Sequence, residues 1–297
     1  MPTIPFSHVD VFAARPYSGN SLAVIIDPPP LAAGQLAAIT RELRHFETIF
    51  ATTGPGPASL TARVFDLEGE LAFAGHPVLG AAAVLHDRQG PGPRDTSVIS
   101  VTLPARTVTV QVTGSLGAGA LAALDQGRPD VLAAPSRSQW PAIAAALGLE
   151  PGDLDENLPP EVISTGLRYL IVPVRAAAAL ARARIRDEDF AGFLAGLGAD
   201  YAYLLDSGGS EGRHWNNDGI IEDVATGSAA GCVAAYLMRR GRAADGESLT
   251  LRQGRFTGRP SEIQITAFGD AQSVSRVVVA GRVSLVAAGH LHALPPA

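Results

Sequence analysis

The pattern of apolar and polar positions divides the chain into an alternation of strands and helices. Residues 4–12 and 21–27 are rich in strand-forming residues, and the turn-forming segment AARPYSGN between them predicts a hairpin. Apolar residues at helical spacing follow a proline start in PPLAAGQLAAITRELRH, and FETIFAT predicts a short strand. We then expect strand, turn and strand in LTARVFDLEGELAFAGHP, a helix in VLGAAAVLHDRQG, and paired strands in VISVTLPARTVTVQVT.

A second half of the chain repeats this order. The early strands are predicted in EVISTGLRYLIVPV, a helix in DEDFAGFLAGLGA, a strand in DYAYLLDS, and a further helix begins near Gly227. The segments SLTLRQGRF and SEIQITAFG predict the closing pair of strands. Gly75 precedes Gly227 by nearly the same distance as Leu103 precedes Leu251. This indicates an internal duplication, the alternative being chance similarity among alanine-rich segments.

A boundary between the halves is expected in the Gly, Ala and Pro-rich region between Gly114 and Ser138, before the helix predicted in WPAIAAALGLEPGDL. The length of 297 residues favours two domains, which we place at residues 1–125 and 126–297. The last strands, in SRVVVAGRVSLVAAGHL, have no counterpart in the first half. We expect them to finish the second sheet or to cross back to the first.

Composition narrows the class of protein. The hydrophobic content of 46%, the charged content of 18% and the absence of long like-charge runs are typical of a soluble globular protein. A net charge of -6 without clustered Lys and Arg argues against a nucleic-acid partner. No segment approaches the ~18 to 20 apolar residues of a membrane span, and MPTIPFSHVDVFAARPY does not resemble a signal peptide, so we expect a cytoplasmic protein. A single cysteine, Cys232, excludes an internal disulfide and a multi-cysteine metal site, and we expect no metal.

Two predicted helix starts share one construction. Gly75 and His76 open the first helix, and Thr226, Gly227 and Ser228 open the second. A helix N-terminus presents unpaired backbone N–H groups and a partial positive charge, so it attracts carboxylates, and glycine lets a ligand come close. If the two halves face each other across a pseudo-twofold axis, both helix starts converge on one cleft.

Each candidate residue also has an ordinary structural interpretation. Thr226 and Ser228 would serve as N-caps, Asp223 as a turn or capping residue, and His76 as a surface residue before a proline. Glu47, in the apolar strand segment HFETIFAT, either points outward or is buried. Burial would raise its pKa toward neutrality, which suits a group that takes and returns a proton. Repetition of the helix start, with a polar residue at each, favours a site.

Five segments together carry a resemblance to a known family: DVFAARPYSGNSLAVI, FETIF, AGHPVLGAAAVL, IIEDVATGSAAGCVAAYL and RQGRFTGRPSEI. In order and spacing they resemble the phenazine-biosynthesis PhzF-like isomerases, which have the diaminopimelate epimerase fold. The resemblance implies an α+β protein of two pseudo-symmetric domains, each a curved barrel-like mixed sheet around a central helix, with the active site between them. It also implies a homodimer, a small carboxylic acid as substrate, and catalysis without metal or organic cofactor.

The resemblance further implies a function and a set of site residues. The best-known reaction of the family isomerises trans-2,3-dihydro-3-hydroxyanthranilate by moving a proton between ring carbons. We therefore expect an isomerase acting on a small cyclic or conjugated carboxylic acid. The alternatives are an epimerase or dehydratase using the same Glu, or a non-catalytic small-molecule-binding protein. By motif, Glu47 is the acid/base, His76, Asp223 and Ser228 hold and polarise the substrate, and the further substrate-binding positions are Asn20, Gly75, Thr226 and Gly227.

The chain departs from the family pattern at two places. Val224 stands where members often have proline in Asp-Pro-Ala-Thr-Gly-Ser, and HWNND, with His214, Trp215 and Asn216, replaces a Phe-centred approach. We expect the first change to relax a turn and the second to reshape the pocket wall. The epimerase branch of the fold uses two cysteines, one at each helix start. Cys232 lies about one turn inside its helix, where small buried residues usually belong to the core, and this argues against a two-thiol racemase.

Overall fold

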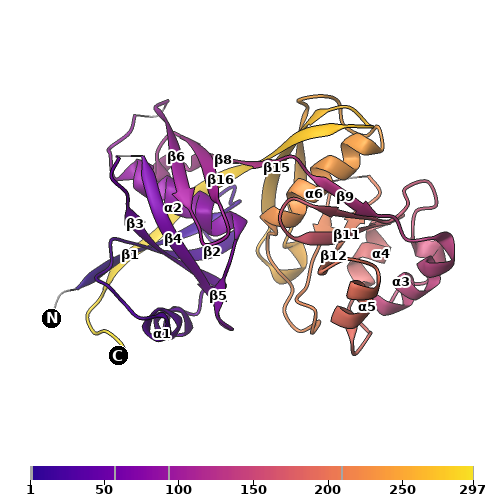
Figure 1. The fold of residues 1–297 in the computed structure, drawn as a ribbon, viewed down its shortest axis with the longest axis horizontal. Helices are drawn as coiled ribbons and strands as arrows, with labels where there is room; N and C mark the ends of the chain where they lie inside the picture. The colour runs from indigo at the N-terminus through magenta and orange to yellow at the C-terminus, as the bar shows by residue number, and fades with distance from the viewer. Residues whose placement is uncertain (1–2, 57, 93, 209, 297) are drawn as a thin grey trace. The chain divides into compact units, whose positions relative to one another are not determined.

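The computed structural model describes residues 3–56, 58–92, 94–208 and 210–296 (Figure 1). The chain divides into two compact units. Unit 1 contains the residues up to Asp125 and those from Ala280 on, and unit 2 contains Gln126–Val279. The chain enters unit 2 within strand β8 (Ala120–Gly127) and returns to unit 1 within β16 (Val274–Leu291), so unit 1 is built from two separate segments and unit 2 from one.

Unit 1 is built on a closed barrel-like sheet of eight strands. The strand order is β1-β2-β3-β4-β6-β7-β8-β16, and antiparallel pairing of β16 with β1 closes it. The pairing of β2 with β3 is parallel and places Leu22 opposite Glu47. The strands not yet bounded are β1 (Ile4–Val11), β2 (Asn20–Ile26), β3 (Glu47–Thr53), β4 (Ser59–Asp66), β5 (Glu70–Leu71), β6 (Thr96–Thr102) and β7 (Thr107–Thr113).

Helix α2 (Gly75–Asp87) occupies the interior of this barrel. Its residues are buried on every side from Gly75 to His86, as expected for an alanine-rich helix without a polar face. A Cβ atom at Gly80 would collide with Leu22, so glycine allows the close approach of α2 to β2. Helix α1 (Ala33–Leu43) covers the outer face of the sheet through an apolar cluster that includes Ile25, Leu36, Ile39, Phe50 and Phe65.

Unit 2 contains two sheets with helix α6 (Gly227–Arg239) between them. α6 packs against β15 of one sheet and against β10 and β11 of the other, and it is buried along most of its length. One sheet has the order β13-β12-β11-β10-β9, and β14 and β15 lead into β16 in the other. The strands are β9 (Asp130–Ala133), β10 (Glu161–Ser164), β11 (Arg168–Val174), β12 (Tyr201–Asp206), β13 (Gly212–Arg213), β14 (Ser248–Gln253) and β15 (Ser261–Gly269).

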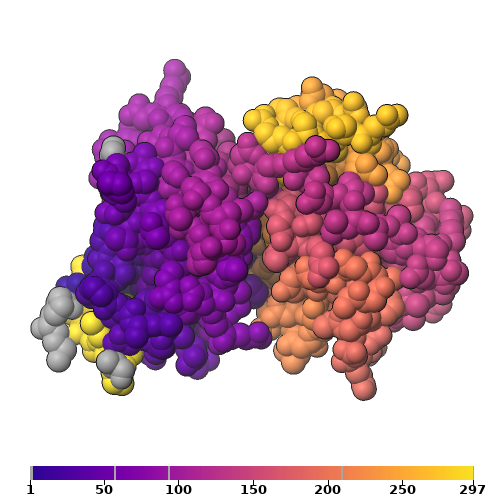
Figure 2. Space-filling view, viewed as in Figure 1, coloured from indigo at the N-terminus to yellow at the C-terminus, as the bar shows by residue number. Residues whose placement is uncertain are grey.

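Three short helices cover the five-stranded sheet of unit 2. They are α3 (Trp140–Ala146), α4 (Ala177–Arg182) and α5 (Phe190–Gly196). One apolar cluster joins them to the sheet, including Ile143, Leu170, Leu180, Leu194 and Leu204. In the space-filling view, the pink and orange segments that contain α3 and α5 form part of the surface of unit 2 (Figure 2).

The two units repeat one order of pairings. In unit 1, β1–β2 is antiparallel, β2–β3 parallel and β3–β4 antiparallel, and in unit 2 the same senses hold for β10–β11, β11–β12 and β12–β13. A buried helix and an antiparallel strand pair follow in both, α2 with β6–β7 and α6 with β14–β15. The predicted α+β class with a barrel-like mixed sheet is confirmed.

Two elements differ from the sequence-based expectation. The Gly, Ala and Pro-rich region between Gly114 and Ser138 contains strands β8 and β9, where we expected only a boundary. In β8, burial alternates along ALAALDQG, but Ala and Leu occupy both faces and hide that period in the sequence. The C-terminal strands are one continuous strand of 18 residues, β16, which pairs with β1 from Val283 to Leu291.

Candidate active site

The first backbone N–H groups of helix α2 are not capped by a side chain. Ala74 occupies the N-cap position in an extended conformation, and no side chain caps the helix. Gly75 and His76 are the first helical residues, followed by a proline that suits the first turn. The first-turn N–H groups and their partial positive charge are thus presented beside His76.

Glu47 faces the start of α2 from the neighbouring sheet. It is the first residue of β3 and lies opposite Leu22, which packs against α2 inside the barrel. The Glu47 Oε2 atom is 3.5 Å from His76 Nε2, and these side chains are only 11% and 6% exposed. Glu47 is therefore not an outward-facing strand residue, and His76 is not a surface turn residue. A carboxylate and an imidazole in contact at a helix N-terminus can exchange a proton with each other or with a ligand.

Asn20 belongs to the same end of the barrel. It begins β2, pairs with Val11 of β1, and is buried. Because side chains alternate along a strand, Asn20 shares the face of Leu22. Strands β2 and β3 are parallel, so their first residues, Asn20 and Glu47, lie at the same end of the sheet. Unit 1 thus gathers four predicted site residues: Asn20, Glu47, Gly75 and His76.

The start of helix α6 in unit 2 is bound into a hydrogen-bond network. Thr226 occupies the N-cap position, but its side chain does not cap the helix. Its Oγ1 instead donates to Asp223 Oδ2 over 2.6 Å, and the Ala225 N–H donates to Asp223 Oδ1 over 3.3 Å. Asp223 therefore closes a tight turn and also accepts the Thr226 hydroxyl. Both residues are buried, at 7% and 6% exposure.

Ser228, at the second position of α6, is held by a tyrosine. Its Oγ lies 2.8 Å from the hydroxyl of Tyr169, and its backbone carbonyl accepts from Thr165 over 3.3 Å. Ser228 is therefore not a side-chain cap of the helix. Burial raises the pKa of the Tyr169 phenol well above its usual value, so the group stays neutral and able to donate or accept. The preceding residue, Gly227, is held through its carbonyl by Gln126 over 3.0 Å.

His214 and two tyrosines form a packed aromatic group beside this helix start. The rings of Tyr169 and Tyr201 stack at 5.5 Å, and the His214 ring meets each edge-on at 5.6 Å. The Nδ1 atom of His214 lies 2.9 Å from the Ala202 carbonyl, which assigns its proton to Nδ1 in the neutral ring. Burial lowers the pKa of His214, an effect that the nearby Asp223 carboxylate opposes. The HWNND departure thus places a neutral imidazole against the tyrosine that holds Ser228.

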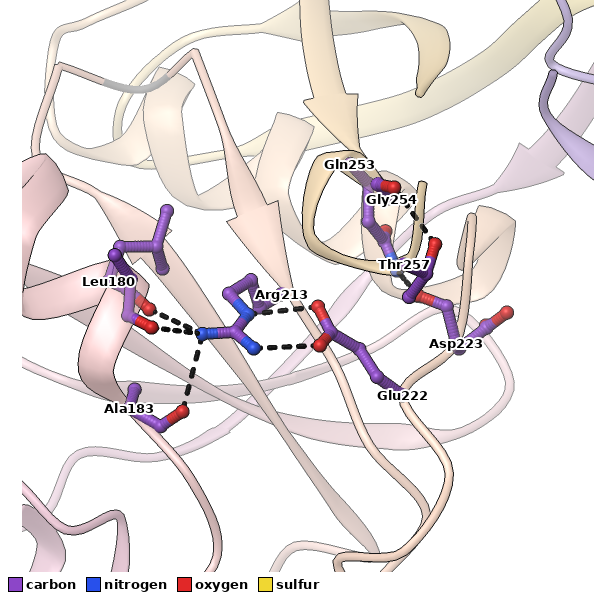
Figure 3. Close-up of polar contacts among 9 residues, drawn as sticks. Leu180, Ala183, Arg213, Glu222, Asp223, Gln253, Gly254 and Thr257 are labelled. Carbon is purple, nitrogen blue, oxygen red and sulfur yellow. Dashed lines mark hydrogen bonds and ion pairs between the residues drawn. The ribbon is translucent and has the colours of Figure 1, made fainter. Parts of the chain in front are cut away.

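Arg213 anchors the strand that leads to Asp223 (Figure 3). Its Nε and Nη2 atoms donate to the two oxygens of Glu222 over 2.8 and 2.7 Å, and Nη1 donates to the carbonyls of Leu180, Ala181 and Ala183. The guanidinium also lies over the Trp215 ring at 4.3 Å. Figure 3 shows the Glu222 carboxylate turned toward Arg213 and the Asp223 side chain turned away from that pair. Of the two adjacent acids, Glu222 is structural, and Asp223 belongs to the helix start.

Val224, which replaces the proline of the family pattern, is held in its turn through its backbone carbonyl. The Val224 carbonyl accepts from Ser261 over 3.0 Å. Gly254, at φ +79°, lies so close that a Cβ atom there would meet this carbonyl at 2.6 Å. Glycine at position 254 is therefore required both by its backbone conformation and by this close approach.

Cys232 is a core residue of α6. It is fully buried and its thiol donates to the Ile163 carbonyl over 3.3 Å. Burial raises its pKa to about 12, so it is a neutral thiol near pH 7. Among residues 3–296, apart from the three undescribed internal positions, no group of three or more His, Cys, Asp and Glu is arranged to hold a metal ion. In the same residues, none of the helices has the length and apolar character needed to span a membrane.

The predicted site residues thus form two groups, one in each unit. Glu47 and His76 touch in unit 1, and Asp223, Thr226 and Ser228 surround the α6 start in unit 2. The expectation that both helix starts face one cleft stays a prediction. Tyr169, Gln253 and Arg213, which hold the second group, were not among the predicted site residues. No local pattern marks them, since Arg213 and Gln253 stand in the mixed polar segments GRHWNND and SLTLRQGRF.

Comparisons with known proteins place the chain in one family. A family model described as phenazine biosynthesis-like protein matches residues 9–289. Trans-2,3-dihydro-3-hydroxyanthranilate isomerase of Pseudomonas aeruginosa is 30% identical over 290 residues, which cover 96% of this chain and 98% of that protein. The enzyme of the same name from Pseudomonas chlororaphis is 29% identical, with 92% and 94% covered. These names confirm the prediction that the chain is an isomerase.

Solved structures agree with the fold. A predicted epimerase from Pseudomonas aeruginosa is 44% identical with a TM-score of 0.90, covering 98% of this chain and 99% of that one. A PhzF-family phenazine biosynthesis protein of Bacillus anthracis is 24% identical with a TM-score of 0.83, covering 99% and 100%. A hydroxyproline epimerase of Agrobacterium vitis shares the fold at 13% identity and a TM-score of 0.62, covering 97% and 92%.

Proposed function

Since the chain belongs to the phenazine biosynthesis-like family, we propose that it is a cofactor-independent isomerase that moves a proton within a small cyclic or conjugated carboxylic acid. Glu47 is the general acid/base of this reaction. The trans-2,3-dihydro-3-hydroxyanthranilate of the curated relatives is the first substrate to test.

The contact between Glu47 and His76 is the observation that carries this proposal. A carboxyl group that is 11% exposed lies 3.5 Å from an imidazole, at the start of a helix whose N-terminus favours negative charge. Such a pair can accept a proton from carbon and hold it until it is donated again or exchanged with solvent. The barrel places the pair on a strand start and a helix start, both of which are rigid elements.

The proposed reaction keeps its proton balance within the site. The Glu47 carboxylate removes a proton from one carbon of the substrate and becomes a neutral carboxylic acid, while the substrate becomes a delocalised anion. The acid then donates a proton, either the one it removed or one exchanged with solvent, to a second carbon and is regenerated as a carboxylate. The developing negative charge is stabilised by helix N-terminal amides, such as those of Gly75 and Gly227, and by the His76 imidazole.

The second group supplies binding rather than proton transfer. Asp223 accepts a hydrogen bond from a substrate hydroxyl or amine, and Ser228 hydrogen-bonds the substrate carboxylate. These roles fit residues whose side chains are already fixed by Thr226 and Tyr169.

An epimerase is the second candidate. The 44% identical solved structure is described as a predicted epimerase, and return of the proton to the opposite face of the same carbon needs the same Glu47 chemistry. A reaction run in deuterated water separates the two candidates. An isomerase places the label or the transferred proton at a new carbon, whereas an epimerase exchanges the original position and inverts its configuration.

The test is turnover of trans-2,3-dihydro-3-hydroxyanthranilate and of a panel of cyclic and dienoic acids. We expect Glu47→Gln to lose at least ~100-fold in kcat, the low end for removal of a general acid/base, while its far-UV circular dichroism is unchanged. Glu70→Gln is the matched control, since Glu70 is a partly exposed carboxylate paired with Arg63 on the same barrel. Near-normal activity in a folded Glu47→Gln protein would remove the assignment.

A further inference from the structure

A buried amide, Gln253, lies beneath the start of helix α6. It ends strand β14 and is 1% exposed, yet its side chain makes four hydrogen bonds. The Oε1 atom accepts from the Thr226 N–H and from the Tyr203 hydroxyl, both over 3.1 Å. The Nε2 atom donates to the Asp223 carbonyl and to Thr226 Oγ1, both over 2.9 Å. These four bonds use the usual capacity of an amide in full.

The backbone N–H of Thr226 fixes which group donates and which accepts in the bonds that link Gln253, Thr226 and Asp223. A backbone N–H can only donate, so the Thr226 N–H requires the oxygen of Gln253 at that position. The amide nitrogen then faces Thr226 Oγ1 and donates to it. The Thr226 hydroxyl proton is left to point at Asp223 Oδ2, 2.6 Å away. The order of donors is therefore Gln253 to Thr226 to Asp223, ending on an acidic oxygen that must accept.

Small residues make room for this arrangement. A Cβ atom at Gly212 would collide with the ring of Tyr203, so glycine lets that ring lie where its hydroxyl reaches Gln253. Burial raises the pKa of Tyr203 well above its usual value, which keeps the hydroxyl protonated and donating.

We infer that Gln253 is a positioning residue for the isomerase site: through Thr226 it holds the Asp223 carboxylate in the orientation that receives the substrate. This inference rests on the proposed function, in which Asp223 contacts the substrate. Without the donated bond from Gln253, the Thr226 hydroxyl can rotate, and the Asp223 carboxylate loses its fixed direction. Gln253 itself does not touch the substrate.

Four variants separate positioning from simple support of the fold. Gln253→Met keeps the size of the side chain and removes its polar atoms, and Thr226→Val keeps the shape of threonine and removes its hydroxyl. Thr226→Ser restores the hydroxyl, and Gln264→Met is the matched control. Gln264 is also a glutamine of this strand pair, and it hydrogen-bonds Thr250 of β14 over 3.0 and 3.2 Å.

Two readouts are measured on each full-length variant. The first is kcat and KM for trans-2,3-dihydro-3-hydroxyanthranilate. We expect Gln253→Met and Thr226→Val each to lower kcat/KM about tenfold, the scale of one lost buried hydrogen bond. The double variant should lose no more than either single one, because both break one chain of bonds. Thr226→Ser should recover most of the loss seen in Thr226→Val, and Gln264→Met should stay within about twofold. For Gln253→Met and Thr226→Val, the division of the loss between kcat and KM should match that of Asp223→Asn.

The second readout needs no substrate. The Ala225 N–H donates to Asp223 Oδ1, so its hydrogen exchange, measured by NMR, reports whether the carboxylate keeps its direction. We expect faster Ala225 exchange in Gln253→Met and Thr226→Val, and wild-type exchange in Thr226→Ser and Gln264→Met. Should Gln253→Met fail to fold, the Val and Ser variants of Thr226 carry the same comparison.

The two readouts distinguish failure of the inference from failure of the proposed function. Unchanged Ala225 exchange in both Gln253→Met and Thr226→Val overturns the relay, whatever the activity. Faster exchange with wild-type kcat/KM overturns its role in positioning the substrate. If the wild-type protein does not convert the probe, the proposed function fails for that substrate, and faster exchange in these two variants alone still supports the relay to Asp223.

Discussion

The starts of helices α2 and α6 are alike in sequence position and in lacking a side-chain cap, but they differ in chemistry. Both begin at a glycine, both lack a side-chain cap, and both are buried beneath a sheet. At α2, the neighbouring polar groups are two titratable side chains, Glu47 and His76, 3.5 Å apart. At α6, Asp223, Thr226 and Ser228 are fixed by hydrogen bonds of 2.6 to 3.1 Å that run back to Gln253 and Tyr169.

This difference suits the two helix starts to different tasks. Glu47 and His76 are two titratable side chains in contact, so the pair can accept and release a proton. The side chains at α6 are already oriented by hydrogen bonds to Gln253 and Tyr169, so they suit holding a ligand in place. In the proposed function, the group at α2 transfers the proton and the group at α6 holds the substrate.

Loss of the buried Arg213–Glu222 pair should have the largest effect. We expect Arg213→Met to lower the free energy of unfolding of the protein by about 3 to 5 kcal/mol, because Glu222 is then left buried without its partner. Arg255→Met is the control, since Arg255 is 55% exposed and its pair with Glu211 should contribute less than about 1 kcal/mol. Chemical denaturation monitored by fluorescence measures both. Equal losses of unfolding free energy in the two variants would show that the Arg213–Glu222 pair stabilises the protein no more than an exposed pair does.

The bond from Tyr169 to Ser228 is the next test of the comparison. We expect Tyr169→Phe to lower kcat/KM about tenfold, because the Ser228 hydroxyl loses a fixed direction. Tyr236→Phe removes a hydroxyl bonded to the Pro159 carbonyl elsewhere on α6, and should change stability but not kcat/KM. Steady-state kinetics of the two variants decides the matter. A wild-type kcat/KM in Tyr169→Phe would mean that Ser228 needs no orientation.

A weaker pH effect is expected from His214. Burial places its folded pKa below the unfolded value near 6.5, so the unfolded chain binds the proton more readily. The stability of the protein should therefore fall as the pH drops below about 6.5 toward the folded pKa. His214→Gln should lose part of this dependence. Melting temperatures at pH 7.5 and 5.5 measure it, and an identical pH dependence in both proteins would refute the assignment.

The smallest effect is expected at Cys232. Its neutral buried thiol lies within α6, and the comparison assigns no proton transfer to that helix. Cys232→Ala should keep kcat within about twofold and lose about 1 kcal/mol of stability. Iodoacetamide should leave the native protein unmodified. Loss of turnover in a folded Cys232→Ala protein would place a second acid/base at α6.

The sequence allowed much of the fold to be predicted, because apolar periodicity and the two glycine-led helices are local signals. The residues that it selected for a site stay predictions, although the structure buries Glu47 against His76 and Asp223 against Thr226. The hairpin of β1 and β2, helices α1, α2 and α6, and the strand of Glu47 all occur where the pattern placed them. Strand β8 was missed because small apolar residues lie on both of its faces.

The support for the second group could not be predicted, because it is formed by contacts between distant segments. Tyr169 and Ser228 are 59 residues apart, and Gln253 and Thr226 are 27 apart. The choice between the adjacent acids Glu222 and Asp223 likewise depends on Arg213, whose pairing no local pattern encodes. Local sequence shows where a helix begins, whereas the direction of each hydroxyl and carboxylate is set by the tertiary structure.

The most direct test of this division of labour is deuterium uptake by trans-2,3-dihydro-3-hydroxyanthranilate in deuterated water, followed by mass spectrometry at saturating substrate. The account predicts that Glu47→Gln abolishes uptake into carbon-bound positions. Asp223→Asn should still exchange once enough substrate is supplied, because Asp223 holds the substrate and Glu47 moves the proton. Uptake at the wild-type rate in Glu47→Gln, together with none in saturated Asp223→Asn, would reverse the two roles and contradict the account.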